Sequence, residues 1–308
     1  MLTQNALSAI GNTPLVQLQN IVPEGSAAIW IKLESLNPTG SFKDRMAQAI
    51  IEEAEKRGTL RPGMTVVECT AGSTGTSLAF VCAVKGYRLR IVSSDAFAKE
   101  KLQSMRALGA EIEIVPSEGG RITPDLIPRM ISRVSEFGQQ AENYWTQQFE
   151  NRDSLEGYQR MGREILHQCP DPIHAFVAAV GTAGMFMGVS HELKQANPNT
   201  RLLALEPAES PVLTQSLKGS HSIDGVGVGF VPPLFVREQC DEIRVISEAR
   251  ARETARLLAA REGILAGTST GLNVAAALEI AQELGKGYTV VTVACDSGLK
   301  YLTGGLFG

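Results

Sequence analysis

Short apolar runs of β type alternate with longer stretches of helical periodicity along most of the 308-residue chain. The apolar runs predict strands at 30–34, 65–70, 89–94, 111–115, 175–180, 202–206, 242–247 and 289–294. Between them, the spacing of apolar positions predicts helices over 42–57, 74–85, 98–108, 125–137, 184–196, 248–262 and 271–285. Strands that alternate with helices are typical of α/β folds with parallel sheets and right-handed crossovers.

The loops that follow these strands are the first places to look for a binding site. Strands such as 175–180 (AFVAAV) are apolar at every position, which predicts burial on both faces of a sheet. In parallel sheets, ligands bind beyond the carboxyl ends of the strands. Attention therefore falls on the loops after 65–70, 175–180 and 289–294, and on the turn before the first long helix.

Composition and charge argue against several classes of protein. With 44% hydrophobic and 20% charged residues, the chain can bury a large core, which predicts two lobes. The net charge of −4 argues against nucleic acid as a partner, and no window is apolar enough to span a membrane. The first residues lack the pattern of a secretory signal. The five cysteines and four histidines show no metal-ligand spacing. We therefore expect a cytoplasmic protein with no metal.

The segment 37–45 (NPTGSFKDR) contains the clearest candidate for chemistry. A Pro/Gly turn comes first, and the S-x-x-D spacing of Ser41 and Asp44 predicts that a helix starts near Ser41. Lys43 would then lie in the first helical turn, where the helix dipole disfavours a cation and favours the neutral amine. A neutral lysine amine is the nucleophile that forms a Schiff base. On these residues alone, a solvated lysine beside an acid and an arginine is the alternative.

Two loops of small residues follow predicted strands. Residues 181–185 (GTAGM) open a predicted helix, where backbone N–H groups, the helix dipole and the Thr182 hydroxyl favour a phosphate. An ordinary tight turn is the alternative. The spacing matches neither GxGxxG nor GxxxxGK[ST], which disfavours NAD and Walker-type nucleotide binding. Residues 70–75 (TAGSTG) form a similar strand-to-helix turn, so we expect this turn also to bind an anion.

Six segments together resemble the pyridoxal-phosphate enzymes of the cysteine synthase / cystathionine β-synthase family. They are IGNTPLV at 10–16, NPTGSFKDR at 37–45, TAGSTG at 70–75, QQFEN at 147–151, GVGVGF at 225–230 and GILAGTSTG at 263–271. The resemblance extends from about residue 8 to residue 307 and is greatest to cysteine synthase. It implies fold type II, like the tryptophan synthase β-chain: an α/β enzyme with two lobes, three-layer parallel sheets with flanking helices, and usually a homodimer.

The resemblance also implies which lobe binds the cofactor, which lobe binds the substrate, and which residues make these contacts. Residues 43–148 would form a smaller, movable lobe that binds the substrate carboxylate, and residues 1–42 and 149–308 a larger lobe that binds the cofactor. Lys43 would hold pyridoxal 5'-phosphate as an internal aldimine and remove the substrate's α-proton. The other implied cofactor contacts are Ser73 to the 3′-oxygen, Ser269 to the pyridine nitrogen, and Gly181, Thr182, Ala183, Gly184 and Met185 to the phosphate. The implied substrate contacts are Thr70, Ala71, Gly72, Thr74, Gln148 and Gly227.

The reaction implied by the resemblance is β-replacement. An activated serine, O-acetylserine or O-phosphoserine, would lose its β-substituent to give an aminoacrylate, and sulfide would add to form L-cysteine. A serine opposite the pyridine nitrogen leaves that nitrogen largely unprotonated, which suits elimination across Cα–Cβ rather than transamination. The partners are then a small amino acid and a sulfide-like nucleophile. Three alternatives stay open: β-elimination of cysteine or serine, a different nucleophile, and a family member that binds without catalysis.

Several residues depart from the family pattern at the expected site. Ala71 and Ser73 replace the serine and asparagine of TSGNTG, Met185 replaces a threonine, and Tyr158 stands where histidine is frequent. These changes leave open whether the donor is O-acetylserine or another compound.

Two further questions stay open in the sequence. Asp296, after the last predicted strand, either lies near the cofactor or only caps its loop. An arginine near the β-position would favour phosphoserine, but nothing in the sequence places Arg121, Arg152 or Arg237 there.

Overall fold

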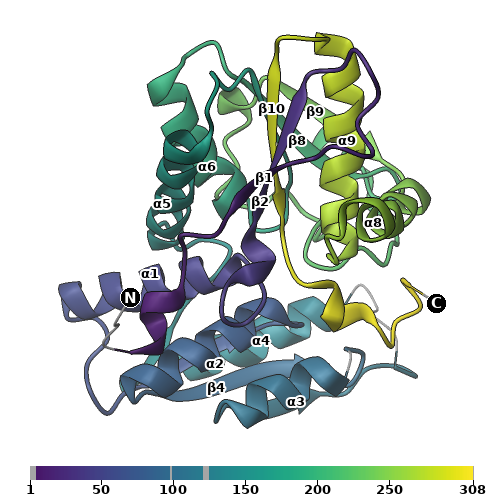
Figure 1. Ribbon diagram of the computed structural model, residues 1–308. Coiled ribbons are helices and arrows are strands. Elements are labelled where there is room, and N and C mark those ends of the chain that lie inside the picture. Colours follow the sequence, from purple (N-terminus) through teal and green to yellow (C-terminus); the bar gives the residue numbers. More distant parts are fainter. Residues whose placement is uncertain (1–4, 98, 121–124, 308) are drawn as a thin grey trace. The chain divides into compact units, whose positions relative to one another are not determined.

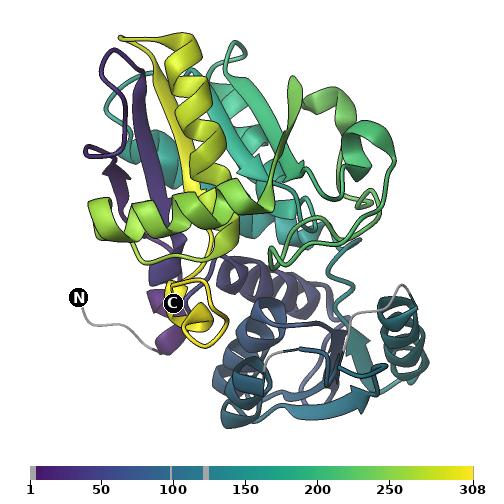
Figure 2. The same ribbon diagram turned by 90° about the vertical axis from the view of Figure 1, so that its right-hand side faces the viewer.

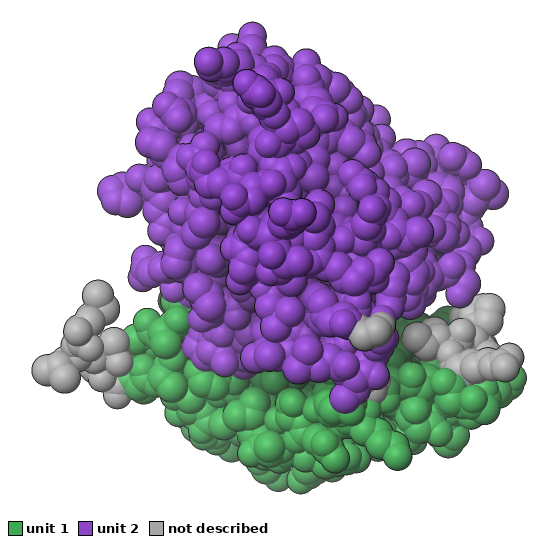
Figure 3. Space-filling model, turned by 45° about the vertical axis from the view of Figure 1, so that its right-hand side comes forward, with its two compact units in different colours: residues 1–10, 43–154 green, residues 11–42, 155–308 purple. Residues whose placement is uncertain are grey.

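A computed structural model describes residues 5–97, 99–120 and 125–307, and the chain folds into two compact units. Unit 1 comprises Met1–Ile10 and Lys43–Ser154, and unit 2 comprises Gly11–Phe42 and Leu155–Gly308 (Figure 3). Each unit contains one sheet with helices on both of its faces (Figure 1). This arrangement confirms the predicted two-lobed α/β class with parallel sheets and flanking helices.

Unit 2 is built on a six-stranded sheet with the strand order β1-β2-β10-β7-β8-β9. Its strands are β1 (Leu15–Gln17), β2 (Ala28–Leu33), β7 (Ala175–Ala179), β8 (Arg201–Pro207), β9 (Glu242–Ile246) and β10 (Thr289–Ala294). β1 pairs antiparallel with β2, and the other neighbours pair in parallel. Its helices are α5 (Asp153–Gln168), which starts just before the unit boundary, α6 (Gly184–Ala196), α7 (Val212–Gln215), α8 (Glu248–Glu262) and α9 (Thr268–Leu284). Short 3-10 helices are η2 (Glu34–Leu36), η3 (Arg237–Gln239) and η4 (Gly298–Tyr301).

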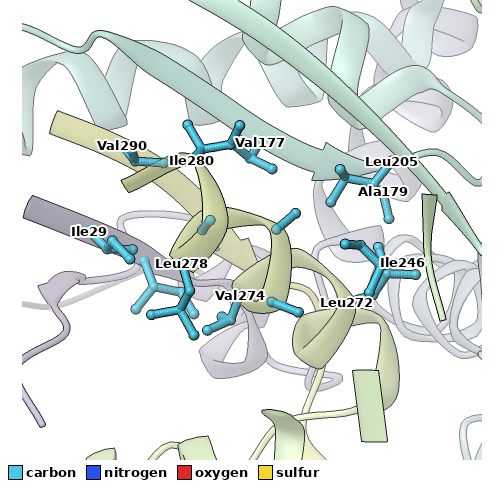
Figure 4. Close-up of a cluster of buried hydrophobic side chains, with 14 of the residues drawn as sticks. Ile29, Val177, Ala179, Leu205, Ile246, Leu272, Val274, Leu278, Ile280 and Val290 are labelled. Atoms are coloured by element: carbon cyan, nitrogen blue, oxygen red, sulfur yellow. The ribbon is translucent and has the colours of Figure 1, made fainter. Parts of the chain in front are cut away.

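The central strand β7 is buried on both faces, as its apolar sequence predicts. Val177 points toward α9, where Figure 4 shows it beside Ile280. Phe176 points the opposite way and stacks on Phe186 of α6 with ring centroids 6.0 Å apart. Figure 1 accordingly shows α5 and α6 on one face of the sheet and α8 and α9 on the other. A strand between two helical layers must be apolar at every position, since neither face reaches water.

Unit 1 contains a four-stranded parallel sheet with the order β5-β4-β3-β6. The strands are β3 (Thr65–Cys69), β4 (Arg88–Ser94), β5 (Glu111–Val115) and β6 (Asn143–Trp145), and the helices are η1 (Ala6–Ala9), α1 (Lys43–Arg57), α2 (Ser73–Lys85), α3 (Lys99–Ala107) and α4 (Leu126–Gly138). Val66 of β3 belongs to a core with α1, α2 and α3, while Val67 belongs to a core with α4. Figure 2 shows the sheet between these two groups of helices.

Most predicted elements are present, with bounds that match or differ by at most three residues. Helix α5, over Asp153–Gln168, was not predicted from the sequence. The signal was present: Tyr158, Met161 and Ile165 are fully buried and lie at helical spacing. β1 and β6 were also missed, because three residues are too few to show a period. Across the residues described, no helix combines the length and the apolar character needed to cross a bilayer.

Candidate active site

The loop between β7 and α6 in unit 2 has the geometry of an anion site. β7 ends at Ala179 and α6 begins at Gly184, so both predicted flanks are confirmed. Ala183, the N-cap residue of α6, has a left-handed backbone with φ of 67°, which costs a non-glycine residue about 1–2 kcal/mol. Strain of this kind concentrates at functional sites. Alanine also has no side-chain oxygen to cap the helix, so first-turn N–H groups stay available to a ligand.

A second glycine-rich loop, 225–229, lies directly against this turn. The amide of Gly227 donates to the carbonyl oxygen of Val180 over 3.2 Å. A Cβ atom at Gly181 would stand only 2.1 Å from the carbonyl oxygen of Gly225. Glycine at 181 is therefore required by the close approach of two backbones. The structure thus brings Gly227, predicted to contact substrate, next to the predicted phosphate loop.

The three helices that follow the candidate loops begin without a side-chain cap, as do α4 and α7. The N-cap residues of α2, α6 and α9 are Gly72, Ala183 and Gly267, none of which makes a side-chain cap. Helix α8, which follows no candidate loop, starts conventionally, with the Ser247 hydroxyl accepting a hydrogen bond from the amide of Arg250. Helices without a side-chain cap leave their first N–H groups to water or a ligand. At the three candidate loops, the uncapped helix starts lie where an anion is predicted to bind.

In unit 1, the loop 70–75 is tied to the 147–151 segment. The Thr74 hydroxyl donates to the Gln148 side-chain oxygen over 2.8 Å, and the Gln148 side-chain nitrogen donates to the carbonyl oxygen of Cys69 over 2.9 Å. The structure therefore brings together two residues predicted to bind substrate. Gln147 has a left-handed φ of 50°, a second strained residue beside the candidate site. The Thr70 hydroxyl accepts from the amide of Gly72, so its own proton remains available to an acceptor.

Glu68, which is not among the predicted site residues, organises this loop. It is 2% exposed at the end of β3. One carboxylate oxygen accepts from the amide of Cys69 at 2.7 Å, and the other accepts from the Thr146 hydroxyl at 2.6 Å and the amide of Gln148 at 2.9 Å. Burial raises the pKa of Glu68, although these three donors oppose the shift. A glutamate inside an otherwise apolar strand is the signal that could have found it.

We expect Glu68→Gln to lower the free energy of unfolding by about 1–3 kcal/mol, because three donors would then face one acceptor oxygen. The pKa of Glu68 is raised in the folded state, so the wild type loses this group's contribution as the pH rises above the ordinary glutamate range. The deficit of the variant should therefore shrink between acidic and neutral pH. Urea unfolding followed by tryptophan fluorescence measures this, since Trp145 precedes Thr146.

The matched control is Glu118→Gln, at an exposed position of unit 1. Its effect should stay within about 0.5 kcal/mol, as for most surface changes. Equal unfolding midpoints for Glu68→Gln and the wild type at both pH values would contradict the role assigned to Glu68.

Lys43 is the first residue of α1, which confirms that it lies in the first helical turn. Its exposure is 8%, which excludes the alternative of a solvated lysine. The backbone leading to it is fixed within unit 2, where the amide of Phe42 donates to the carbonyl oxygen of Cys295 over 3.1 Å. A lysine this deeply buried at a helix N-terminus is suited to nucleophilic chemistry.

Ser269 lies in the first turn of α9 and is 4% exposed. This turn is held against the carboxyl ends of two strands. The Thr270 hydroxyl accepts from the amide of Cys295, directly after β10, over 2.9 Å. The Asn273 side chain accepts from the amide of Ala179, at the end of β7, over 2.8 Å. Ser269 and the loop 181–185 thus share the carboxyl edge of the unit 2 sheet, where ligands bind in parallel α/β folds.

The structure shows where most of the remaining candidate residues lie. Tyr158 is a buried core residue whose ring lies 5.7 Å from that of Phe42. Arg152 and Arg237 are exposed, and Arg121 lies outside the described residues. Ser73 starts α2, and Ala71 precedes the N-cap residue Gly72, as the predicted loop requires. Within the described ranges, no group of three His, Cys, Asp or Glu side chains could hold a metal ion.

Comparisons with known proteins find relatives that match nearly the whole chain. The family model described as "Pyridoxal-phosphate dependent enzyme" matches residues 6–296. The cysteine synthase of Staphylococcus aureus is 40% identical over 98% of this chain and 96% of its own length. O-ureido-L-serine synthase of Streptomyces lavendulae is 36% identical over 99% and 93%. The crystal structure of a hydrogen sulfide-producing enzyme from Fusobacterium nucleatum matches with a TM-score of 0.92 and 36% identity, over 98% of this chain and 99% of that one.

Proposed function

The chain belongs to the family of pyridoxal-phosphate-dependent enzymes, and on that premise we propose that it converts an O-activated L-serine and sulfide to L-cysteine. It is an enzyme of the cysteine synthase type, and its cofactor is pyridoxal 5'-phosphate. Its relatives support β-replacement as the reaction class. The choice of O-acetylserine or O-phosphoserine as donor, and of sulfide as nucleophile, is the proposal.

The observation that carries this proposal is the buried lysine at the start of α1. We propose that the Lys43 amine binds the cofactor aldehyde and later takes the α-proton of the substrate. When bound, the cofactor supplies an electron sink for the negative charge left at the substrate's Cα. Burial of Lys43, which is 8% exposed, keeps water away from the place where the substrate would react.

The other proposed contacts follow from the chemistry of each donor set. The start of α6, with residues 181–185, suits the cofactor phosphate, because the turn consists of small residues and has no side-chain cap. The Ser269 hydroxyl suits the ring nitrogen, since a neutral hydroxyl does not force that nitrogen to be protonated. Ser73 would contact the 3′-oxygen with one hydrogen bond. The residues present therefore fit this cofactor.

Unit 1 would hold the substrate carboxylate. The start of α2 offers the N–H group of Thr74. The Gly72 amide donates to the Thr70 hydroxyl, whose own proton remains available to the carboxylate. Gln148 would keep Thr74 in place through their hydrogen bond. We propose that residues 43–148 move when substrate binds, because closing a site on a carboxylate keeps water from a reactive intermediate. Ala71 contributes no hydroxyl, so the carboxylate would depend more on the helix start than in relatives with serine there.

We further propose a cytoplasmic homodimer. The five cysteines, all within the described residues, form no disulfide, which is the usual state in a reducing compartment. Large apolar side chains reach the surface of unit 2 at Leu36, Leu299 and Leu302, which are 61%, 66% and 56% exposed. Exposed apolar side chains favour a subunit interface where they form one contiguous patch. Sedimentation of the purified enzyme measures the oligomeric state.

The function is tested by product analysis with a panel of donors. The purified enzyme is incubated with O-acetylserine, O-phosphoserine, serine or cysteine, each with and without sulfide, and cysteine and pyruvate are measured. We expect cysteine from one of the two O-activated serines only when sulfide is present. Equal pyruvate with and without sulfide, and no cysteine, would instead establish β-elimination. That outcome matters because one structural relative is a hydrogen sulfide-producing enzyme.

A further inference from the structure

Three segments far apart in the sequence form a short antiparallel ribbon within unit 2. Its middle strand is 295–298. On one side, the amide of Ser297 donates to the carbonyl oxygen of Gly40 over 3.0 Å, and Ser41 pairs with Asp296. On the other side, the amide of Gly267 donates to the carbonyl oxygen of Asp296 over 3.2 Å. Ala266 pairs with Ser297 in the same ladder. The ribbon therefore joins the segment that leads into Lys43 to the loop that leads into Ser269.

The side chain of Asp296 lies at the centre of this ribbon and is held by Tyr301. The Tyr301 hydroxyl donates to a carboxylate oxygen of Asp296 over 2.7 Å, and Asp296 is 6% exposed. Burial raises the pKa of Tyr301 well above its ordinary value, and the charge of Asp296 adds to the shift. The tyrosine therefore remains a protonated donor to a buried carboxylate. Hydrogen bonds of this charge-assisted kind are among the stronger ones in proteins.

This pair packs directly against the N-cap residue of α9. A Cβ atom at Gly267 would lie 2.4 Å from a carboxylate oxygen of Asp296 and 2.5 Å from the Tyr301 ring. Any larger residue at position 267 would overlap with the Asp296 carboxylate and the Tyr301 ring, so only glycine fits there. Gly267 precedes Ser269 by two residues, so the position of the pair sets where α9 begins. Asp296 therefore contacts the start of α9.

We propose that Asp296 and Tyr301 are a positioning pair that fixes the Ser269 hydroxyl relative to the segment entering Lys43. The inference rests on the proposed roles of Lys43 and Ser269 toward the cofactor. Lys43 is the first residue of the segment proposed to move and directly follows the ribbon, so its main chain should keep its distance from Ser269 when that segment moves. The ribbon connects the segment that ends at Phe42 to the loop before Ser269, and the half-buried Asp296–Tyr301 hydrogen bond holds the helix start against it.

The test compares the holoenzyme with Tyr301→Phe, which removes one hydroxyl, and Asp296→Asn, which removes the charge. We expect both variants to shift the visible absorption band of the bound cofactor and to lower kcat about 10- to 100-fold, as for loss of a hydrogen bond to a charged group. The KM for the amino-acid donor should change much less, because the carboxylate loop is in unit 1. The double variant should be little worse than either single one, since the two side chains act as a unit.

Tyr288→Phe is the matched control, because Tyr288 is a 45% exposed tyrosine of the same unit. It should leave the spectrum and kcat unchanged. If Tyr301→Phe and Asp296→Asn only lower the unfolding temperature and keep the wild-type spectrum and kcat, the pair is structural and the inference is overturned. If the wild type makes no cysteine from any donor, the proposed function fails instead, while the spectral comparison still tests the pair.

Discussion

Lys43→Ala is expected to reduce kcat by at least about 10⁴-fold and to remove the visible absorption band of the lysine-bound cofactor. Proton transfer by a positioned side chain contributes typically about 10²–10⁴-fold, and this lysine is also proposed to bind the cofactor aldehyde, so both contributions are lost together. The substitution should leave the fold intact, because alanine is the best helix former and Lys43 begins α1. Absorption spectra and steady-state kinetics of the purified variant measure both effects.

Lys56→Ala serves as the control, because it makes the same change on the same helix at a side chain that is 62% exposed. It should retain the band and nearly full activity. A Lys43→Ala enzyme that kept the wild-type band and wild-type turnover would show that another residue binds the cofactor.

Gly181→Ala should weaken cofactor binding about 10- to 100-fold. A Cβ atom at this position would come 2.1 Å from the carbonyl oxygen of Gly225, and backbone cannot move aside as a flexible side chain can. Overpacking of this kind costs about 1–3 kcal/mol, and each 1.4 kcal/mol corresponds to a factor of ten in affinity. The added methyl group separates the two loops and displaces the start of α6, where the phosphate is proposed to bind. Titration of the apoenzyme with pyridoxal phosphate gives the dissociation constant.

Circular dichroism of the same Gly181→Ala sample shows whether the variant is folded when its affinity is measured. The control is Gly304→Ala, where a Cβ atom would meet its nearest neighbour at 3.7 Å, an ordinary van der Waals contact. A folded Gly181→Ala protein with wild-type affinity would remove this loop from the cofactor site.

The local features of the candidate site are encoded within short stretches of sequence. The turn and S-x-x-D spacing around Lys43 predict a helix start near Ser41, and α1 begins at Lys43. The apolar run 175–180 and the small residues after it predict a buried strand that ends in an anion-type turn, as observed. Such features depend on a few neighbouring residues, so they can be read from periodicity and turn chemistry. The family motifs add the cofactor, which local patterns alone do not identify.

The role of Glu68 could not be read from the sequence in the same way. Its three donors include the Thr146 hydroxyl and the amide of Gln148, which lie 78 and 80 residues further along the chain. Strand β3 reveals only that an acidic residue interrupts an apolar run. Which donors surround it depends on β6 pairing with β3. The three-residue strand β6 has no periodic signal of its own.

The sequence by itself determined the α/β class, most helices and strands, and the buried strand β7, because these depend on hydrophobic periodicity over a few turns or residues. It also marked Lys43 and the two small-residue loops. Tertiary structure alone decided which loops meet: residues 181 and 225 in close backbone contact, Glu68 with Thr146, and Asp296 with Tyr301 under Gly267. The two units themselves are assembled from discontinuous segments. Contacts between distant segments arise from packing, whose free energy depends on all partners at once. No single segment therefore shows a periodic pattern from which these contacts could be predicted.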